Sequence, residues 1–261
     1  MNSKKISVIL IAIAFFIIAV FCAVSATTVR AINVNFAISE STDAQSIQRA
    51  LDKNLGKNLI LLSEDEVRQT LADNHYMEII SVDKKFPNVV NVSIKERREI
   101  YYTEYEGQTY VTDENGFVLK QGQPSGNTRE KIKLTIGEGI VLTSLQPGSI
   151  IKTDNDNLLA LVFDVAKKVN LTDCIESILI ERSFGEIDEY DVVFKAYTGV
   201  ELRVLKVMTK GEEKAVNAFN AYNEKLTDYQ KISGEIMSFL MDDGRLRVNY
   251  SDGTHVIPIE P

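Results

Sequence analysis

Histidine and cysteine, the residue types that most often serve catalysis and metal binding, are scarce in this sequence. The 261 residues include two His and two Cys. His75 and His255 lie far apart in the chain, whereas a metal triad or a Ser-His-Asp arrangement needs a histidine placed with partners. The patterns HExxH, GxSxG and GxxxxGK[ST] do not occur. The sequence therefore predicts no catalytic residue, no metal and no cofactor, and it favours a non-enzymatic protein.

Two other groups of residues could in principle bind a metal or form a disulfide. Residues 154–157 (Asp-Asn-Asp-Asn) begin like a calcium-binding loop, but the glycine at position 6 and the glutamate at position 12 are missing. We interpret them as the start of a helix. Cys22 lies in an apolar N-terminal run and Cys174 far outside it, so no disulfide is expected and Cys174 reads as a buried thiol.

The N-terminal run is apolar from residue 6 to residue 24 and is interrupted only by Ser7. About 20 helical residues at ~1.5 Å each cover the ~30 Å hydrocarbon core of a bilayer. Lys4 and Lys5 precede the run and only Arg30 follows closely, which favours a cytoplasmic N-terminus. We predict a cytoplasmic tail at residues 1–5 and a single transmembrane helix at residues 6–26.

A cleaved signal peptide is the alternative for the same run, since Val24-Ser25-Ala26 is an acceptable cleavage site. The apolar run is longer than the 7–15 residues usual for a signal peptide, which favours the retained anchor. The rest of the chain has ordinary globular composition, with 44% hydrophobic and 25% charged residues. A net charge of −8 without a basic patch argues against nucleic acid as a partner.

Residues 29–97 have the pattern of a small α+β module in the order strand, helix, helix, strand, strand. A capping-box pair at Ser63 and Glu66 predicts the start of the second helix. Alternation predicts strands at 77–84, with Ile80 and Val82 on one face, and at 89–94. A turn at residues 86–88 joins them, and we expect Phe86 to fill the core.

Residues 98–261 have the pattern of a mostly antiparallel β domain with two or more helices. Glu106-Gly107 marks a hairpin between strands at 100–105 and 108–112. Helical spacing of apolar residues marks two helices, at 158–169 and 215–226. Further strands are expected at 117–120, 175–181, 190–197, 200–207, 235–241, 245–250 and 254–259.

The segment from Val82 to Arg97 resembles the end of the polypeptide-transport-associated (POTRA) domain of the bacterial division protein family FtsQ/DivIB. That family shows a strand, a basic residue, Phe-Pro-Asn, a second strand and then Glu-Arg. Residues 56–59 are similar to its Gly-x-Asn-Leu, and residues 113–116 to its Asp-x-x-Gly turn. The residues that carry the motif are Gly56, Asn58, Phe86, Pro87, Asn88, Glu96 and Arg97.

The resemblance implies a fold with one anchor, a POTRA domain at residues 29–97 and an FtsQ/DivIB-type β domain at residues 98–261. It implies a scaffold in the plasma membrane at the division septum, with its large domains outside the cytoplasm. The implied partners are small coiled-coil membrane proteins of the FtsB/DivIC and FtsL types, and indirectly the septal cell-wall synthases. Phe-Pro-Asn has a structural explanation, which we favour, and a direct binding role as the alternative.

The terminal segment is similar to the last strands of that family's β domain, whose edge a partner extends by one strand. The residues expected to bind a partner are Leu246, Val248, Tyr250, Asp252, Gly253, Thr254, Val256 and Pro258. Tyr250 is the expected anchor, with inward packing as its alternative. A rival function is an extracytoplasmic enzyme, or enzyme regulator, acting on peptidoglycan, which needs a cleft with convergent carboxylates or a nucleophile. An outer-membrane transporter fragment would need repeated POTRA modules and a barrel.

Overall fold

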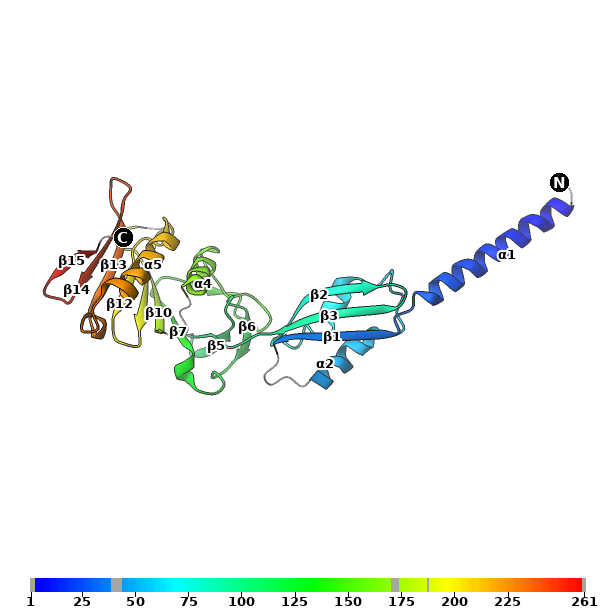
Figure 1. Ribbon diagram of the computed structural model, residues 1–261, viewed down its shortest axis with the longest axis horizontal. Helices are drawn as coiled ribbons and strands as arrows, with labels where there is room; N and C mark the ends of the chain where they lie inside the picture. Colours follow the sequence, from blue (N-terminus) through cyan, green and yellow to red (C-terminus); the bar gives the residue numbers. More distant parts are fainter. Residues whose placement is uncertain (1–2, 39–43, 170–173, 187, 260–261) are drawn as a thin grey trace. The chain divides into compact units, whose positions relative to one another are not determined.

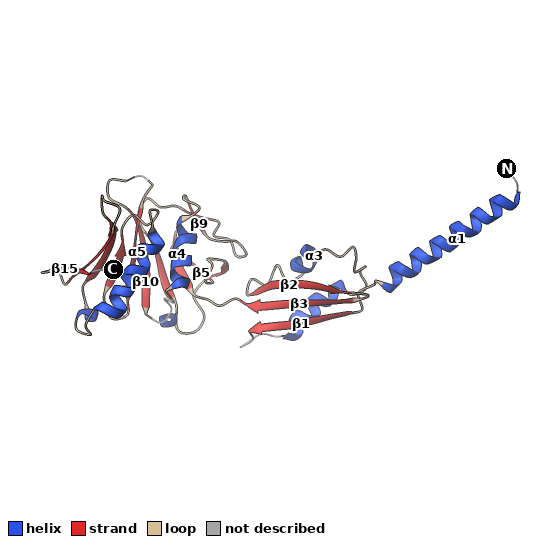
Figure 2. Ribbon diagram, turned by 45° about the horizontal axis from the view of Figure 1, so that its top comes forward, coloured by secondary structure: helices blue, strands red, loops and turns tan. Residues whose placement is uncertain are grey.

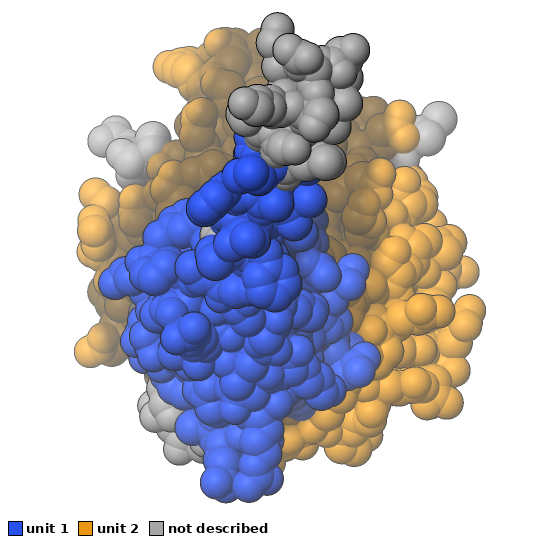
Figure 3. Space-filling view, turned by 90° about the vertical axis from the view of Figure 1, so that its right-hand side faces the viewer, with its two compact units in different colours: residues 1–97 blue, residues 98–261 orange. Residues whose placement is uncertain are grey.

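The computed structural model describes the chain apart from residues 1–2, 39–43, 170–173, 187 and 260–261. The chain divides into two compact units, residues 1–97 and 98–261, which Figure 3 colours blue and orange. Each unit has its own cluster of buried apolar side chains. The two units can therefore be described separately.

Unit 1 begins with helix α1, Ser3–Ala26. Within the part of the chain that the structure describes, no helix is both long enough and apolar enough to span a bilayer. The transmembrane helix expected at residues 6–26 thus stays a prediction. The expected cytoplasmic tail, residues 1–5, lies partly outside the described residues.

After α1, unit 1 is a three-stranded sheet with helices, in the predicted order β-α-α-β-β (Figure 2). The central strand β3 pairs in parallel with β1 and antiparallel with β2. The helices contribute Ile47, Leu51 and Val67 to the core beneath the sheet. The elements are β1 Ala31–Ile38, α2 Ala44–Leu51, the 3₁₀ turn Asp52–Asn54, α3 Glu64–Gln69, β2 Met77–Lys85 and β3 Val89–Glu96.

The start of α3 is fixed by the predicted capping box. The Ser63 hydroxyl accepts from the Glu66 amide at 3.1 Å, and the Glu66 carboxylate accepts from the Ser63 amide at 3.0 Å. These bonds satisfy two amides that a helix otherwise leaves unpaired at its N-terminus. The hydrogen bond from the Ser63 backbone and the nearby Lys57 lower the pKa of the Glu66 carboxyl. The prediction from the Ser63–Glu66 spacing is confirmed.

Strand β2 corrects one expectation. A β-bulge lies between Ile79 and Ser81, where the register with β3 shifts. The extra residue reverses the alternation, so Ile79 and Val82 are buried while Ile80 is 51% exposed. The prediction that Ile80 and Val82 lie on one face was wrong, because period-two spacing assumes a regular strand. In β3, Val90, Val92 and Ile94 alternate as expected for a regular strand and are all buried.

Phe86 corrects a second expectation. Its side chain is 68% exposed, so it does not fill the core of unit 1. It begins the turn Phe86-Pro87-Asn88 between β2 and β3, beyond the last paired residues Lys85 and Val89. At that position no neighbouring strand covers the ring, and the core is filled from β3 instead. The turn is attached through its backbone, since the Asn88 carbonyl accepts from the Arg30 amide at 2.9 Å.

The remaining motif residues have structural roles. Gly56 has a φ of +83°, a conformation that favours glycine, and its amide donates to the Val29 carbonyl at 3.0 Å. The Asn58 side chain accepts from the Ile60 amide at 2.9 Å and so shapes its own loop. At the other end of the sheet, Glu96 ends β3. The Arg97 guanidinium lies 3.5 Å from the Glu78 carboxylate.

Unit 2 is built on one ten-stranded sheet with the order β15-β14-β13-β12-β11-β10-β7-β4-β5-β6. Pairing is parallel between β4 and β7, β7 and β10, and β12 and β13, and antiparallel elsewhere in this sheet. The expectation of a mostly antiparallel α+β domain is confirmed. The strands are β4 Tyr101–Tyr105, β5 Gln108–Thr112, β6 Val118–Gln121, β7 Ile132–Ile136, β10 Ile175–Arg182, β11 Tyr190–Ala196, β12 Glu201–Val204, β13 Glu235–Leu240, β14 Leu246–Ser251 and β15 Val256–Ile259.

Helices α4 and α5 pack their apolar side chains into the core of this sheet (Figure 1). Phe163 of α4 stacks near Tyr101, with ring centroids 5.0 Å apart, and Phe219 of α5 meets Phe194 edge-on. The α5 helix continues into a π-helical turn. The remaining elements are α4 Leu158–Lys168, α5 Gly211–Asn220, the π turn Ala221–Lys225, the two-stranded β8 Leu142–Thr143 with β9 Lys152–Thr153, and the 3₁₀ turns Thr128–Glu130 and Gln230–Ile232.

Candidate interaction site at the terminal sheet edge

The residues expected to bind a partner all lie in one hairpin, formed by β14 and β15. In the described part of the chain, β15 pairs with β14 and ends the ten-stranded sheet on that side. Strand β14 supplies Leu246, Val248 and Tyr250, the turn supplies Asp252, Gly253 and Thr254, and β15 supplies Val256 and Pro258. The residues expected to bind a partner therefore form one contiguous hairpin, and among the described strands none pairs with the outer side of β15.

The Asp252 carboxylate organises the turn of this hairpin. Its Oδ1 accepts from the Thr254 hydroxyl at 2.7 Å and from the Thr254 and His255 amides at 2.8 Å each. These hydrogen bonds, the hydroxyl bond first, lower the pKa of Asp252 to about 2. Gly253 has a φ of +89°, which other residues seldom adopt. The turn is thus fixed by a charged side chain and a glycine.

The two faces of the hairpin differ in exposure. The register places Ile257 opposite Tyr250 and Ile259 opposite Val248. Val248, Tyr250 and Ile259 pack into the core, whereas Ile257 is 46% exposed. Val256 and Pro258 lie on the opposite face because side chains alternate along a strand. Val256 is 64% exposed. The edge strand therefore carries accessible apolar side chains that no described residue covers.

Tyr250 packs inward, which was the alternative to its expected role as the anchor. It is 4% exposed, and its hydroxyl donates to the Ser233 carbonyl at 3.0 Å. Burial raises the pKa of its phenol. Gly234 makes room for the ring, since a Cβ there would lie 2.8 Å from Tyr250 Cε2. Tyr250 and the fully buried Val248 therefore pack into the core, and a role of either residue in binding a partner stays a prediction.

The backbone of β15 determines which hydrogen-bond donors and acceptors are open to another strand. A proline is tolerated in an edge strand when its nitrogen, which has no hydrogen, faces away from the neighbouring strand. Pro258 stands opposite Asn249 of β14, so we infer that its nitrogen faces the open edge. Backbone groups two residues apart point to the same side, so the Val256 amide and carbonyl face that edge as well. Val256 is then the backbone donor that β15 offers to another strand.

Two features near this edge were missed by the sequence analysis. A cavity of about 140 Å³ lies between the π turn and the hairpin, lined by Asn217, Asn220, Ala221, Glu224, Lys225, Val248 and Ile259. Tyr229 and Ile232 are exposed apolar side chains in the segment just before Ser233, which bonds Tyr250. The cavity brings together residues from α5, the π turn and the hairpin that are distant in sequence, which no local pattern could have indicated.

The residues considered for catalysis or metal binding are dispersed. Asn157 precedes α4 as its N-cap, so residues 154–157 do begin a helix as predicted. Asp154 accepts from the Arg182 guanidinium at 2.7 Å. His255 is exposed on the hairpin turn, and Cys174 is partly buried. Among the described residues, no three His, Cys, Asp or Glu side chains are grouped closely enough to hold a metal ion.

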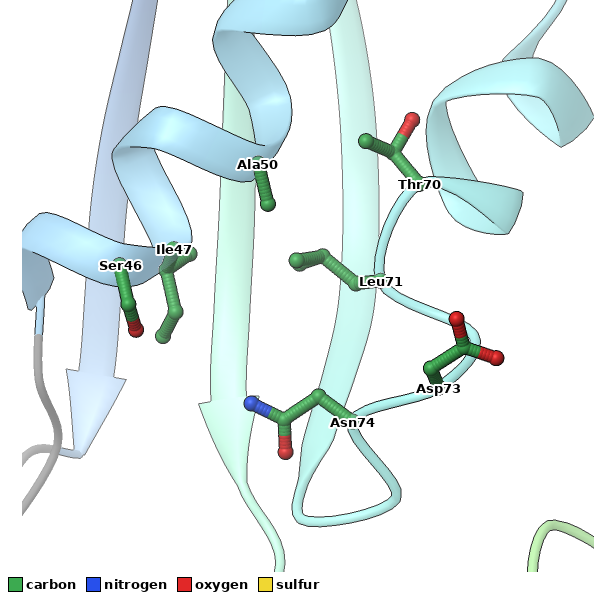
Figure 4. Close-up of a pocket in the computed structure, with 7 residues that line it drawn as sticks. All are labelled: Ser46, Ile47, Ala50, Thr70, Leu71, Asp73 and Asn74. Carbon is green, nitrogen blue, oxygen red and sulfur yellow. The ribbon is translucent and has the colours of Figure 1, made fainter.

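A hollow in unit 1 lies between α2 and the segment that follows α3 (Figure 4). It measures about 260 Å³ and is lined by Ser46, Ile47, Ala50, Thr70, Leu71, Asp73 and Asn74. Its lining combines apolar side chains from the edge of the core with one carboxylate and three small polar groups. No histidine or cysteine is among these seven residues.

Comparison with known proteins identifies the first domain. Residues 27–97 match the family model described as "POTRA domain, FtsQ-type". A solved structure of the major extracytoplasmic domain of the cell division protein DivIB from Geobacillus stearothermophilus also matches, at 15% identity and a TM-score of 0.30. That match covers 51% of this chain and 98% of the other.

Curated relatives match over one third to two thirds of the chain. The cell division protein DivIB of Clostridium botulinum (strain Hall) is 24% identical over 66% of this chain and 62% of its own length. DivIB of Clostridium tetani is 27% identical over 48% of each chain, and FtsQ of Rickettsia felis is 29% identical over 35% of each. The chain thus spans less than two thirds of the length of these relatives. The resemblance seen in the sequence is confirmed: the chain is a relative of the bacterial cell-division proteins FtsQ and DivIB, and residues 27–97 are an FtsQ-type POTRA domain.

Proposed function

We propose that this protein is a bitopic membrane scaffold of the bacterial division machinery, anchored by residues 6–26 with its N-terminus in the cytoplasm. Its POTRA and β domains would act outside the cytoplasm at the septum. There it would bind small coiled-coil division proteins of the FtsB/DivIC and FtsL types and help control septal cell-wall synthesis. The names of its relatives and the FtsQ-type POTRA domain support this proposal.

The observation that carries the proposal is the free edge of β15. A partner strand placed beside it would extend the ten-stranded sheet through main-chain hydrogen bonds, which supply affinity without requiring a polar cleft. The exposed Val256 would supply one side-chain contact on the outer face. Tyr229 and Ile232, exposed nearby, offer further apolar area. Aromatic side chains in such positions often carry much of the binding energy.

The experiment replaces Val256 by proline and, as a matched control, by threonine. The control keeps the β-branched shape and the backbone amide, whereas Val256→Pro removes the donor that faces the open edge. One main-chain hydrogen bond is worth about 0.5–1.5 kcal/mol, and the ring also obstructs the approach of a strand. We expect affinity for the extracytoplasmic part of a DivIC-type partner to fall about tenfold or more in the proline variant.

Affinity would be measured by titration calorimetry with residues 27–261, and folding would be checked by circular dichroism. A folded proline variant that binds as tightly as the threonine control would place the partner site elsewhere. Deletion of residues 254–261 is a poorer test, because β15 covers the buried Val248 and Tyr250 of β14. Its loss would change folding as well as binding.

A further inference from the structure

Three exposed apolar side chains lie at the end of the POTRA domain that α1 enters. They are Ile60, Leu61 and Phe86, which we call the proximal cluster. Leu61 is 80% exposed and Phe86 68% exposed, and Ile60 is also exposed. Side chains of this size exposed together in a small domain indicate a contact surface, since a folded domain has little reason to keep them in water.

The loop that carries Ile60 and Leu61 is bonded to the end of α1. The Asn58 side-chain amide donates to the Val24 carbonyl at 3.3 Å and to the Thr27 hydroxyl at 3.0 Å. The Leu59 amide donates to the Thr27 carbonyl at 2.7 Å. Asn58 also pairs with Thr28, which follows the last residue of α1 by two positions and so lies within about 7 Å of it along the chain.

The same Asn58 fixes the direction in which the loop continues. Its Oδ1 accepts from the Ile60 amide at 2.9 Å and from the Leu61 amide at 3.3 Å. Asn58 therefore holds Ile60 and Leu61 close to the C-terminal end of α1. Leu59 and Leu62, on either side of them, are buried in the core. The loop thus turns two apolar residues into the core and two away from it.

Phe86 reaches the same end of the domain from the other side. The Val29 amide donates to the Lys57 carbonyl at 2.8 Å, and the next amide, Arg30, donates to the Asn88 carbonyl at 2.9 Å. The loop that contains Asn58 and the turn that contains Phe86 are therefore both hydrogen-bonded to residues 29 and 30, just before β1. Figure 1 shows the β2–β3 turn at the end of the sheet that α1 enters.

We propose that the proximal cluster inserts into the outer surface of the lipid bilayer and holds the POTRA domain against the membrane. The inference rests on the proposed function, in which α1 is the anchor. Residues bonded to the last turn of an anchor lie at the membrane interface whichever way the domain is tilted. Partly inserted Leu, Ile and Phe side chains are what interfacial protein surfaces use there.

The charges around the cluster show which part of the lipid it recognises. Arg30, Lys84 and Lys85 lie beside the Phe86 turn, while Glu64, Asp65 and Glu66 follow the Asn58 loop on α3. Lys57 lies 3.7 Å from Glu66. This mixture gives no net preference for an anionic headgroup. The contact is therefore made with the apolar layer just beneath the headgroups, and it is expected in uncharged phosphatidylcholine.

The chain has no tryptophan, so a single introduced Trp is a clean reporter. Full-length protein would be placed in phosphatidylcholine nanodiscs that contain lipids spin-labelled at a shallow or a deep acyl position. The variants are Leu61→Trp and Phe86→Trp in the cluster and Phe16→Trp in α1. The matched control is Ile80→Trp, which replaces an exposed apolar residue of β2 five positions, or about 17 Å, from the end of the strand at Lys85.

We expect shallow spin labels to quench the Trp at positions 61 and 86 at least twice as strongly as the Trp at position 80, and deep labels to quench position 16. Quenching at position 16, with positions 61 and 86 no more quenched than position 80, would keep the anchor and overturn the inference. No quenching at position 16 would overturn the anchor itself, and the inference with it. Quenching at positions 61 and 86 only after anionic lipid is added would show an electrostatic contact and also contradict the proposal.

Discussion

Replacing Phe86 by alanine should have little effect on the stability of the POTRA domain. Burying a whole Phe side chain contributes about 1.5–3 kcal/mol. With 68% of the side chain exposed, roughly a third of that contribution is at stake, which is about 0.5–1 kcal/mol. By contrast, Ile94 is fully buried in the centre of the sheet, and Ile94→Ala should cost about 2–5 kcal/mol.

The assay is urea unfolding of residues 27–97, which contain the whole core of unit 1, followed by far-UV circular dichroism. The two variants would be compared with the unaltered domain at equal m-values, so that the shift in midpoint reports the free energy of unfolding. A loss above about 2 kcal/mol for Phe86→Ala would refute the reasoning, because only a packed ring can contribute that much. The ring would then belong to the core, and its proposed contact with lipid would fall too.

Three further outcomes are expected in the β domain. Tyr250→Phe removes the hydroxyl bond to Ser233 and should lower the free energy of unfolding by about 0.5–1.5 kcal/mol, measured by denaturant titration. Gly234→Ala should cost more, because its φ is +109° and the new Cβ would lie 2.6 Å from the Ser251 carbonyl oxygen; a thermal melt unchanged from the unaltered protein would contradict this. The low pKa of Asp252 means that its support of the hairpin turn is complete above its ordinary value of 3.8 and is lost as pH falls through about 2. The Thr254 amide shift, followed by NMR, should titrate with that midpoint and should not titrate in Asp252→Asn.

The sequence predicted best the features that depend on local spacing. The Ser63–Glu66 capping box, the alternation of β3 and the hairpin at Glu106-Gly107 involve residues close together in the chain, and the structure contains all three. Strand β7, Ile132–Ile136, was missed although its residues alternate. It pairs in parallel with β4 and β10, and no turn signal marks such distant partners.

The predictions that failed were those that depended on where a residue lies in the fold and not on its residue type. Phe86 is as apolar as any core residue, but it lies past the ends of the strands it joins. Ile80 lies inside a strand, but a bulge turns it outward. Tyr250 was expected to anchor a partner because interfacial tyrosines bury much area, but its ring packs inward into the space that Gly234 leaves. Alternation with a period of two tells which side chains of a strand share a face. It does not tell which strand lies at the edge of the sheet or which face is buried.

The position of Pro258 has a consequence for self-association. Within Val256–Ile259, the free edge offers one backbone N–H, from Val256, and two backbone carbonyls, from Val256 and Pro258. Two copies of this strand laid side by side would thus share an excess of acceptors over donors, and a carbonyl would go unsatisfied on each copy. A foreign strand without proline brings donors for both carbonyls. Within Val256–Ile259, pairing with a different chain would therefore satisfy more hydrogen bonds than pairing with a second copy, and a proline in an edge strand generally disfavours self-association.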